Sequence, residues 1–262
     1  MPAPTRPSNA PRILALETSG RTGSVALAQG PDLRAEESFA HGMRHAVALM
    51  PTVAALCQRV GWQAADIDEV YVSTGPGSFT GLRIAVAVAR TLAQALGCRL
   101  VAVNTLDAIA ANAPADATDV VVVLDAKRSQ VFAARYARHS AAADPGAAPM
   151  PLAAGAAGLR RVAGPILTDP TTFVAATPRP VAVMGEGVAY HREALRAGVA
   201  ADAELRELDA ALWTPRAATI CRLGWALAQR GSFTPLEELL PVYIRLAEAE
   251  ELWRKRRGLP VP

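Results

Sequence analysis

Cysteine is scarce in this sequence, and its cysteines lie far apart. Cys57, Cys98 and Cys221 are the only three among 262 residues. An odd number of widely separated cysteines is typical of reduced thiols and not of a disulfide framework or a zinc knuckle. We therefore expect no disulfide, no structural zinc and a cytoplasmic protein.

Long hydrophobic runs and a strong net charge are also missing. No uninterrupted apolar run reaches the roughly 20 residues of a membrane-spanning helix, so we expect no membrane contact. Hydrophobic residues make up 51% of the chain and charged residues 19%, which favours a globular protein. The net charge is +3, and residues 254–257 alone supply four positive charges. Glu250 and Glu251 precede them at helical ion-pair spacing, so this basic tail is interpreted as a solvated helix end, with contact to RNA as the alternative.

The known nucleotide loops are absent, although a glycine-rich turn is present. Gly75, Gly77 and Gly81 follow the pattern GxGxxxG, which lacks the spacing of the dinucleotide fingerprint and the lysine of a Walker loop. The spacing therefore argues against a nicotinamide enzyme. The turn nevertheless opens a helix, and the backbone N–H groups at a helix N-terminus attract anions. A phosphate could bind there.

Motifs for nucleophilic or metal catalysis are missing as well. Phe79 stands where a GxSxG motif needs its nucleophile. His41 and His45 are four residues apart, but Gly42 separates them and no third ligand is near, so no metal site is expected. His139 and His191 have no serine or acid that the sequence places beside them.

Two segments have the same plan of an apolar strand that ends in an acid, a polar turn and a second strand. They are residues 13–27, with Glu17 at the first strand's end, and residues 120–136, with Asp125. An opening hairpin also argues against a Rossmann domain, whose first strand leads into a crossover helix. We predict an α/β protein of two similar lobes.

The predicted boundaries follow from this duplication. Residues 1–11 are a proline-rich flexible leader, and residues 12–113 and 114–213 are the first and second lobes. A helix at about 214–231 packs back on the first lobe, and residues 232–262 form a C-terminal segment with the basic tail. Residues 138–165, rich in alanine, glycine and proline, are expected at the surface.

The two acids are predicted to face a shared cleft between the lobes. There they could orient a metal-bound phosphate or a water, or they could simply accept backbone N–H bonds within their turns. A second glycine turn, residues 185–187, lies late in the chain. The candidate phosphate contacts are Glu17, Thr18, Ser19, Gly75, Gly77, Ser78, Asp125, Gly185 and Gly187.

The helix after the first glycine turn is apolar on nearly every side. A strand at residues 70–73 precedes it, Ser78 or Thr80 caps it and Gly97 ends it. Gly81, Ala85, Ala89 and Ala93 recur every four residues and form a ridge of small side chains that another element can approach closely. Such a helix lies in its own protein's core or at a partner's surface.

A second apolar helix is predicted over residues 43–60, with a kink at Pro51. If both helices meet a partner, the ridge and the apolar side chains of the second helix form the seam. The predicted interface residues are Met43, Val47, Met50, Ala54, Gly81, Leu82, Ala85, Val88, Ala89 and Leu92.

The duplicated hairpins and the two glycine turns resemble the actin, Hsp70 and sugar-kinase superfamily. LETSGRTGSVAL (16–27), STGPGSFTGLRIAVAVARTLA (73–93), LDAKRSQVFAARY (124–136) and PVYIR (241–245) more closely resemble the TsaB (YeaZ) family. The likeness is strong over residues 12–137 and returns at 241–245. It implies a two-lobed actin-like (ASKHA) fold with duplicated mixed sheets.

The resemblance also implies a function. TsaB proteins are non-catalytic subunits that heterodimerise with TsaD, which transfers a threonylcarbamoyl group to adenosine 37 of tRNA; the ATPase TsaE joins them, and TsaB alone forms homodimers. TsaD binds a metal through an HxxxH pair, and Thr105 and Ile109 occupy those positions here. ATP or ADP and metal are accordingly expected on the partner subunits, and no cofactor on this chain. Family knowledge places the first two helices at the interfaces.

The sequence departs from the family where Glu17 replaces a common aspartate, in the proline-rich leader and in the stretch after Arg138. An autonomous ATPase or phosphotransferase that uses Glu17, Asp125 and Mg²⁺ is the competing prediction, because the fold alone does not exclude it. A glycopeptidase is the third hypothesis, but the sequence has neither the metal-binding pair nor the nucleophile that this activity would need.

Overall fold

The structure is a computed structural model that describes residues 10–39, 45–138, 159–200, 204–245, 253–254 and 256–258. Most of the predicted leader lies outside these residues, as do His41, Met43, His139, most of the stretch 138–165 and most of the basic tail. Predictions about them stay predictions.

The first lobe is built on a mixed five-stranded sheet in the order β3-β2-β1-β4-β5. Strands β1, β2 and β3 are antiparallel neighbours, whereas β4 runs parallel to β1 and β5 parallel to β4. The β1–β2 pair is the predicted first hairpin, with Glu17 opposite Ser24. The bounds are β1 Arg12–Glu17, β2 Gly23–Gln29, β3 Asp32–Phe39, β4 Glu69–Gly75 and β5 Arg99–Asn104.

The second lobe repeats this topology strand for strand. Its sheet has the order β8-β7-β6-β9-β10, with antiparallel pairing among β6, β7 and β8 and parallel pairing from β6 through β9 to β10. The predicted duplication is therefore confirmed. The bounds are β6 Asp119–Asp125, β7 Val131–Arg138, β8 Leu159–Thr168, β9 Val181–Met184 and β10 Leu205–Glu207.

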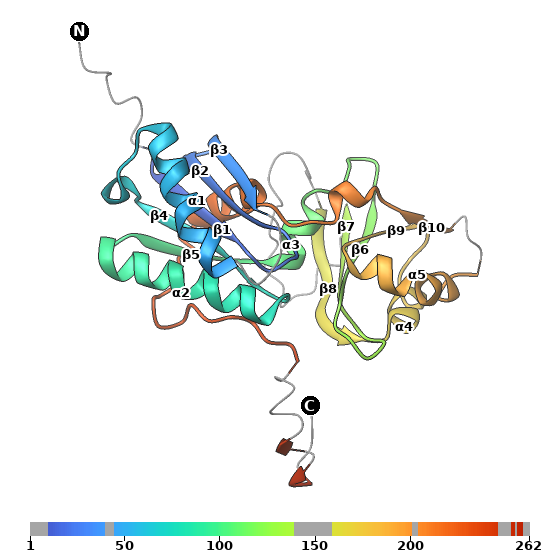
Figure 1. The fold of residues 1–262 in the computed structure, drawn as a ribbon. Helices are drawn as coiled ribbons and strands as arrows, with labels where there is room; N and C mark the ends of the chain where they lie inside the picture. The colour runs from blue at the N-terminus through green and yellow to red at the C-terminus, as the bar shows by residue number, and fades with distance from the viewer. Residues whose placement is uncertain are drawn as a thin grey trace.

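Helices connect the strands at equivalent places in the two lobes (Figure 1). Each lobe has a helix before its fourth strand, a helix between its fourth and fifth strands and a helix after its fifth. In chain order the helices are α1 His45–Val60, η1 Ala64–Asp66, α2 Phe79–Leu96, α3 Thr105–Ala110, α4 Pro170–Ala175, α5 Gly187–Ala197, η3 Ala210–Leu212 and α6 Ala217–Ala228.

The helices and sheets form successive layers. In the first sheet, Leu14 and Leu16 face α1 and α2, whereas Ile13 and Ala15 belong to a core with α3 and α6. That second core continues into the other lobe, where Val120 and Val122 of β6 join it. Helices α4 and α5 cover the outer face of the second sheet. A continuous apolar core therefore joins the lobes, and α6 packs back on the first lobe as predicted.

Local signals in the sequence set the ends of α2. The Ser78 side chain caps its first turn by accepting a hydrogen bond from the Gly81 amide at 3.3 Å, and Gly97 ends it in a left-handed conformation, with φ 71°. Helix α1 continues through Pro51.

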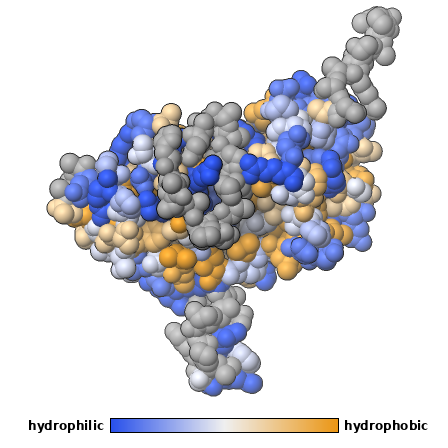
Figure 2. Space-filling view, turned by 180° about the vertical axis from the view of Figure 1, so that it is seen from behind, coloured by the Kyte–Doolittle hydropathy of each residue, from blue (hydrophilic) through white to orange (hydrophobic). Residues whose placement is uncertain are grey.

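Among the described residues, α2 is long and apolar enough to cross a membrane, by length and composition only. In the structure one face of α2 packs on β4 and β5, whereas Arg83, Thr91 and Gln94 are exposed. Figure 2 shows the face of the molecule opposite to the view in Figure 1, with hydrophilic side chains at both ends and a hydrophobic cluster near the lower edge.

Candidate functional site

The acid of the first hairpin is sealed inside the protein. Glu17 is fully buried, and its Oε1 accepts hydrogen bonds of 2.5 Å from the amide and from the hydroxyl of Ser19. Its Oε2 has no hydrogen-bond partner in the described part of the chain. Burial raises the pKa of the Glu17 carboxyl, and the bonds from Ser19 offset only part of that rise. The turn-stabilising role is therefore present, and the predicted exposure to a cleft is wrong.

The acid of the second hairpin lies in a polar cluster instead. Asp125 accepts hydrogen bonds from the Lys127 amide at 3.0 Å and from Lys127 Nζ at 2.6 Å. Its Oδ1 also lies 3.1 Å from His191 Nε2. Partial burial opposes ionisation of Asp125, but the bonds from Lys127 and His191 prevail and lower its pKa. Asp125 is thus held as a carboxylate.

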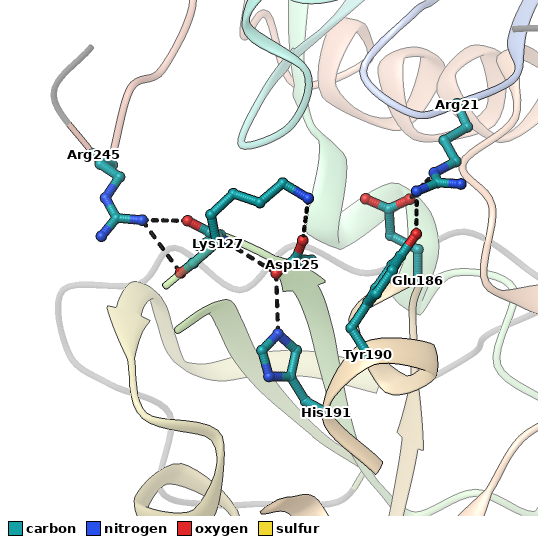
Figure 3. A network of polar contacts seen from close by, with 8 residues as sticks. Arg21, Asp125, Lys127, Glu186, Tyr190, His191 and Arg245 are labelled. Atoms are coloured by element: carbon teal, nitrogen blue, oxygen red, sulfur yellow. Dashed lines mark hydrogen bonds and ion pairs between the residues drawn. The ribbon is translucent and has the colours of Figure 1, made fainter. Parts of the chain in front are cut away.

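The turn after Asp125 has an unusual backbone. Lys127, Arg128 and Ser129 all have positive φ, at 64°, 55° and 58°, a conformation that costs energy in residues other than glycine. Arg245 supports this turn by donating to the carbonyl of Ala126 (Figure 3). It also donates to Gln130 Oε1 at 2.7 Å. The PVYIR motif therefore fastens the C-terminal segment to the second hairpin.

Arg21 links the two lobes next to this cluster (Figure 3). It lies in the turn of the first hairpin, donates to the Tyr190 hydroxyl and approaches Glu186 Oε2 at 3.7 Å. Its guanidinium also lies 5.5 Å from the centre of the Tyr190 ring. Tyr190 belongs to α5 and Glu186 immediately precedes it, so the contact joins the first hairpin to the second glycine turn.

A cavity of about 260 Å³ separates the hairpin of the first lobe from the second lobe. Among the predicted phosphate contacts, Ser19 lines it, whereas Glu17 and Asp125 do not. Thr105, one of the two positions matching the metal pair of TsaD, also lines it, and its buried Oγ1 lacks a partner in the described chain. Other lining residues are Arg21, Leu124, Glu186 and Trp213.

The glycine turns have a packing role that the sequence analysis did not foresee. A Cβ on Gly81 would overlap the Thr18 carbonyl oxygen, and one on Gly77 would lie 2.5 Å from that of Ser19. The Ser78 amide donates to the same Ser19 carbonyl at 2.7 Å, and Thr18 Oγ1 donates to the carbonyl of Gly81 at 2.7 Å. The first hairpin therefore packs in direct contact with the glycine turn and fills the space on that side of the turn.

The other glycines among the candidate phosphate contacts also lie close to the backbone of neighbouring segments. A Cβ on Gly75 would lie 2.9 Å from the Val242 carbonyl oxygen, one on Gly185 would overlap that of Val123, and one on Gly187 would lie 3.0 Å from the same strand. Close packing thus accounts for all of these glycines. Phosphate contact at Gly75, Gly77, Ser78, Gly185 and Gly187 stays a prediction.

The small-residue ridge of α2 is part of the protein's own core. Ala85 and Ala89 are fully buried, Leu82 is 1% exposed and Gly81 is buried too. They pack toward β4, the strand that leads into this helix. The prediction that they meet a partner is therefore wrong, because the element that approaches the ridge so closely is the chain's own sheet.

The other predicted interface residues that the structure describes are at least partly accessible; Met43 lies outside the described residues. On α1, Val47 is 71% and Met50 42% exposed, and Ala54 is exposed as well. These residues follow helical spacing, so they share one face. On the neighbouring α2, Val88 and Leu92 are half-buried. Together these five residues form what we call the outer face of α1 and α2.

Comparisons with known proteins agree on one family. The model of a family described as TsaD, tRNA N6-adenosine threonylcarbamoyltransferase, matches residues 40–253. The chain is 29% identical over 245 residues to the tRNA threonylcarbamoyladenosine biosynthesis protein TsaB of Bacillus subtilis, covering 92% of this chain and 97% of that protein. It is 33% identical over 129 residues to the protein of the same name in Escherichia coli, covering 48% and 55%.

A solved structure supports the same relationship. YeaZ from Pseudomonas aeruginosa superposes with a TM-score of 0.70 at 27% identity, covering 89% of this chain and 99% of that one. The resemblance to TsaB and YeaZ is thus confirmed, together with the two-lobed actin-like α/β fold.

Proposed function

Because the chain belongs to the TsaD family of tRNA N6-adenosine threonylcarbamoyltransferases, we propose that it serves the tRNA threonylcarbamoyladenosine pathway as a subunit similar to TsaB. In this proposal it is a non-catalytic scaffold and activator that heterodimerises with TsaD in the cytoplasm. TsaE and tRNA join through the complex, ATP or ADP and metal reside on the partner subunits, and the chain alone forms a homodimer.

The outer face of α1 and α2 carries this proposal. Val47 and Met50 are large apolar side chains left 71% and 42% exposed over a fully packed layer, with no described element of the chain above them. Covering such side chains with a partner removes apolar surface from water, at roughly 25 cal/mol per Å². Thr105 and Ile109 support the non-catalytic part, because neither side chain is a ligand suited to a transition metal.

Val47→Asp combined with Met50→Asp tests the scaffold. A buried, unpaired carboxylate is costly, so association with the cognate TsaD is expected to weaken by about 30-fold or more while the monomer stays folded. Ile166→Asp is the matched control, since Ile166 is 43% exposed on the second lobe. Unchanged association by light scattering would overturn the proposal.

Activity gives a second readout. Mixing the chain with cognate TsaD, TsaE, tRNA and ATP, and scoring modified adenosine with each component omitted, should show that the chain is required but inert alone. Product from the lone chain would refute the non-catalytic role.

An autonomous ATPase is the second candidate, and the cavity between the lobes favours it. That candidate function requires Glu17 and Asp125 to converge on Mg²⁺. Glu17 does not meet this requirement, because it is fully buried and does not line the cavity. Calorimetry of the isolated chain with ATP and Mg²⁺ separates the two, because the scaffold is expected to bind weakly and to hydrolyse nothing. The glycopeptidase reading has no supporting observation among the described residues.

A further inference from the structure

One ionisable side chain lies inside the core that joins the two lobes. Asp107 belongs to α3 of the first lobe and is only 3% exposed. Its Oδ1 accepts a hydrogen bond of 2.7 Å from the Tyr136 hydroxyl and lies 3.2 Å from Arg161 Nη1. Tyr136 belongs to β7 and Arg161 to β8, so both partners come from the second lobe. Asp107 therefore bonds across the boundary between the lobes.

These contacts satisfy only one of the two carboxyl oxygens of Asp107. Both of them go to Oδ1, and Oδ2 accepts no hydrogen bond from the described residues. Burial raises the pKa of Asp107, and the Arg161 guanidinium and the Tyr136 hydroxyl offset only part of that rise. An ionised Asp107 is thus costly while the lobes stay together, and the cost falls when water reaches Oδ2.

The strands packed against α3 bring no second charge to Asp107 in the part of the chain that the structure describes. Tyr71 of β4 donates its hydroxyl proton to Glu69 of the same strand. Arg135 of β7 pairs with Asp119 of β6 at 2.7 Å. The side chains of β6 that join the core around α3 are apolar.

The other charged and titratable groups around α3 are also directed elsewhere. Arg138 of β7 donates to a main-chain carbonyl at 2.8 Å, and Arg222 of α6 reaches another at 3.4 Å. Cys221 of α6 is a buried thiol whose pKa is raised by burial. Among the described residues, Arg161 is therefore the one cation that bonds to Asp107.

The chain crosses between the lobes twice, and Asn112 joins the two crossings. Residues 111–118 lead from α3 to β6, and residues 208–216 lead from β10 to α6. Asn112 Nδ2 donates to the Leu212 carbonyl at 3.2 Å and to the Thr214 carbonyl at 3.0 Å. The lobes are held together at this point, so a change in their relative orientation is a rotation about the crossings.

We propose that Asp107 is a proton-operated latch between the lobes. While its carboxyl is neutral, Asp107 stays dry between α3 and the second sheet, and the lobes stay together. When the carboxyl ionises, the lobes rotate about the crossings far enough for water to reach Oδ2. The inference concerns the chain alone and does not depend on the proposed function.

The sign of the pH dependence follows from burial. Because the pKa of Asp107 is raised while the lobes are closed, the closed form binds the proton more strongly than an open form in which water reaches the carboxyl. The closed form is therefore favoured at low pH. The open form gains as pH rises above the ordinary pKa of 3.8 and through the raised value.

Energy transfer between two dyes measures the separation of the lobes. Gln58 of α1 and Glu193 of α5 are exposed, one on each lobe, so Gln58→Cys combined with Glu193→Cys takes the dyes. The native cysteines are buried, and an excess of unlabelled chain suppresses transfer between copies. Transfer efficiency is expected to fall along one titration curve between about pH 4 and about pH 9. A constant efficiency over this range would overturn the latch.

Three variants assign the curve to Asp107. Asp107→Asn keeps an acceptor for Tyr136 and removes the charge, so efficiency should stay high at every pH. Arg161→Gln removes the attraction that favours the carboxylate, so the midpoint should move to higher pH by about one unit. Asp116→Asn is the matched control and should leave the curve unchanged, because Asp116 lies on the same crossing but is exposed.

The outcomes decide the assignment. If Asp107→Asn retains the wild-type curve, the response belongs to another acid and the latch is refuted; a midpoint that Arg161→Gln leaves in place refutes it as well. Glu17→Gln should not alter the curve, since Glu17 is buried within the first lobe. Circular dichroism at both ends of the pH range checks folding. Should Asp107→Asn fail to fold, the midpoint of Arg161→Gln decides, because that side chain is partly exposed.

Discussion

The two lobes share one topology, yet the acids at equivalent positions in their hairpins have opposite electrostatic environments. Glu17 ends β1, is fully buried and has a raised pKa. Asp125 ends β6, contacts Lys127 and His191 and has a lowered pKa. The two lobes therefore share the backbone topology, whereas the acids in their hairpin turns differ in burial, hydrogen-bond partners and direction of pKa shift.

The difference arises from what each hairpin packs against. In the first lobe the hairpin turn lies directly on the start of α2. The Ser19 carbonyl accepts from the Ser78 amide, the Thr18 hydroxyl donates to the Gly81 carbonyl, and the Thr18 backbone leaves no room for a Cβ on Gly81. In the second lobe the hairpin is held by side chains, among them Arg245 from the C-terminal segment. The first hairpin is part of the core, whereas the second is a polar junction.

Gly81→Ala should have the largest effect, because it breaks the packing that distinguishes the first hairpin. Its Cβ would overlap the Thr18 carbonyl oxygen, and neither backbone can move without disturbing α2 or β1. We expect a loss of about 3 kcal/mol or more in the free energy of unfolding, measured by urea denaturation.

Gly20→Ala is the control for that substitution. Gly20 lies in the same hairpin turn, but its Cβ would meet Pro215 at 3.7 Å and the Thr22 carbonyl oxygen at 3.9 Å, which are ordinary contacts. A change within about 0.5 kcal/mol is expected. If Gly81→Ala were equally mild, the tight contact between hairpin and helix would not define the first lobe.

Glu17→Gln should stabilise the protein at neutral pH. Because burial raises the pKa of Glu17, the folded state retains its proton more strongly than the unfolded one, and wild-type stability falls as pH rises above the ordinary pKa of 4.5. Glutamine keeps an acceptor for Ser19 and carries no charge. We expect a gain of roughly 1 kcal/mol at pH 8, shrinking toward pH 4, in thermal unfolding. Destabilisation at pH 8 would show that the carboxylate is needed.

Asp125→Asn should act in the opposite direction. Its pKa is lowered in the folded state, so the ionised carboxylate contributes stability above its ordinary pKa of 3.8, and this contribution is lost as pH falls through the folded value. We expect a loss of about 1 kcal/mol at pH 7 that vanishes in strong acid. A pH profile parallel to that of wild type would contradict the contrast between the two acids.

The sequence predicted the elements whose signals are local. Ser78 and Gly97 delimit α2 through their own chemistry. An apolar strand that ends in an acid, followed by a polar turn and a second strand, predicted both hairpins. Burial was harder, because a ridge of small residues shows only that something approaches closely. Here that neighbour is the chain's own sheet, so Ala85 and Ala89 were wrongly placed at an interface.

Contacts distant in the sequence carried no local signal. His191 lies 66 residues from Asp125 and was left without a partner, although the structure places them 3.1 Å apart. The close approach of Gly81 to Thr18 likewise depends on how β1 and α2 are assembled. The acid at the end of each hairpin's first strand and the glycine turn in each half were the signals available, and neither specifies which residues meet.

Arg21→Ala should have the smallest effect, although Arg21 visibly joins the two lobes. Its side chain is 65% exposed and lies 3.7 Å from Glu186, and exposed ion pairs contribute about 0–1 kcal/mol. The lobes are coupled instead by the continuous core of α3 and α6, where Leu106 and Ile220 are fully buried. We therefore expect a loss of at most about 0.5 kcal/mol and one cooperative transition in calorimetry. Separate transitions for the two lobes would show that this surface contact, and not the shared core, makes the duplicated halves unfold together.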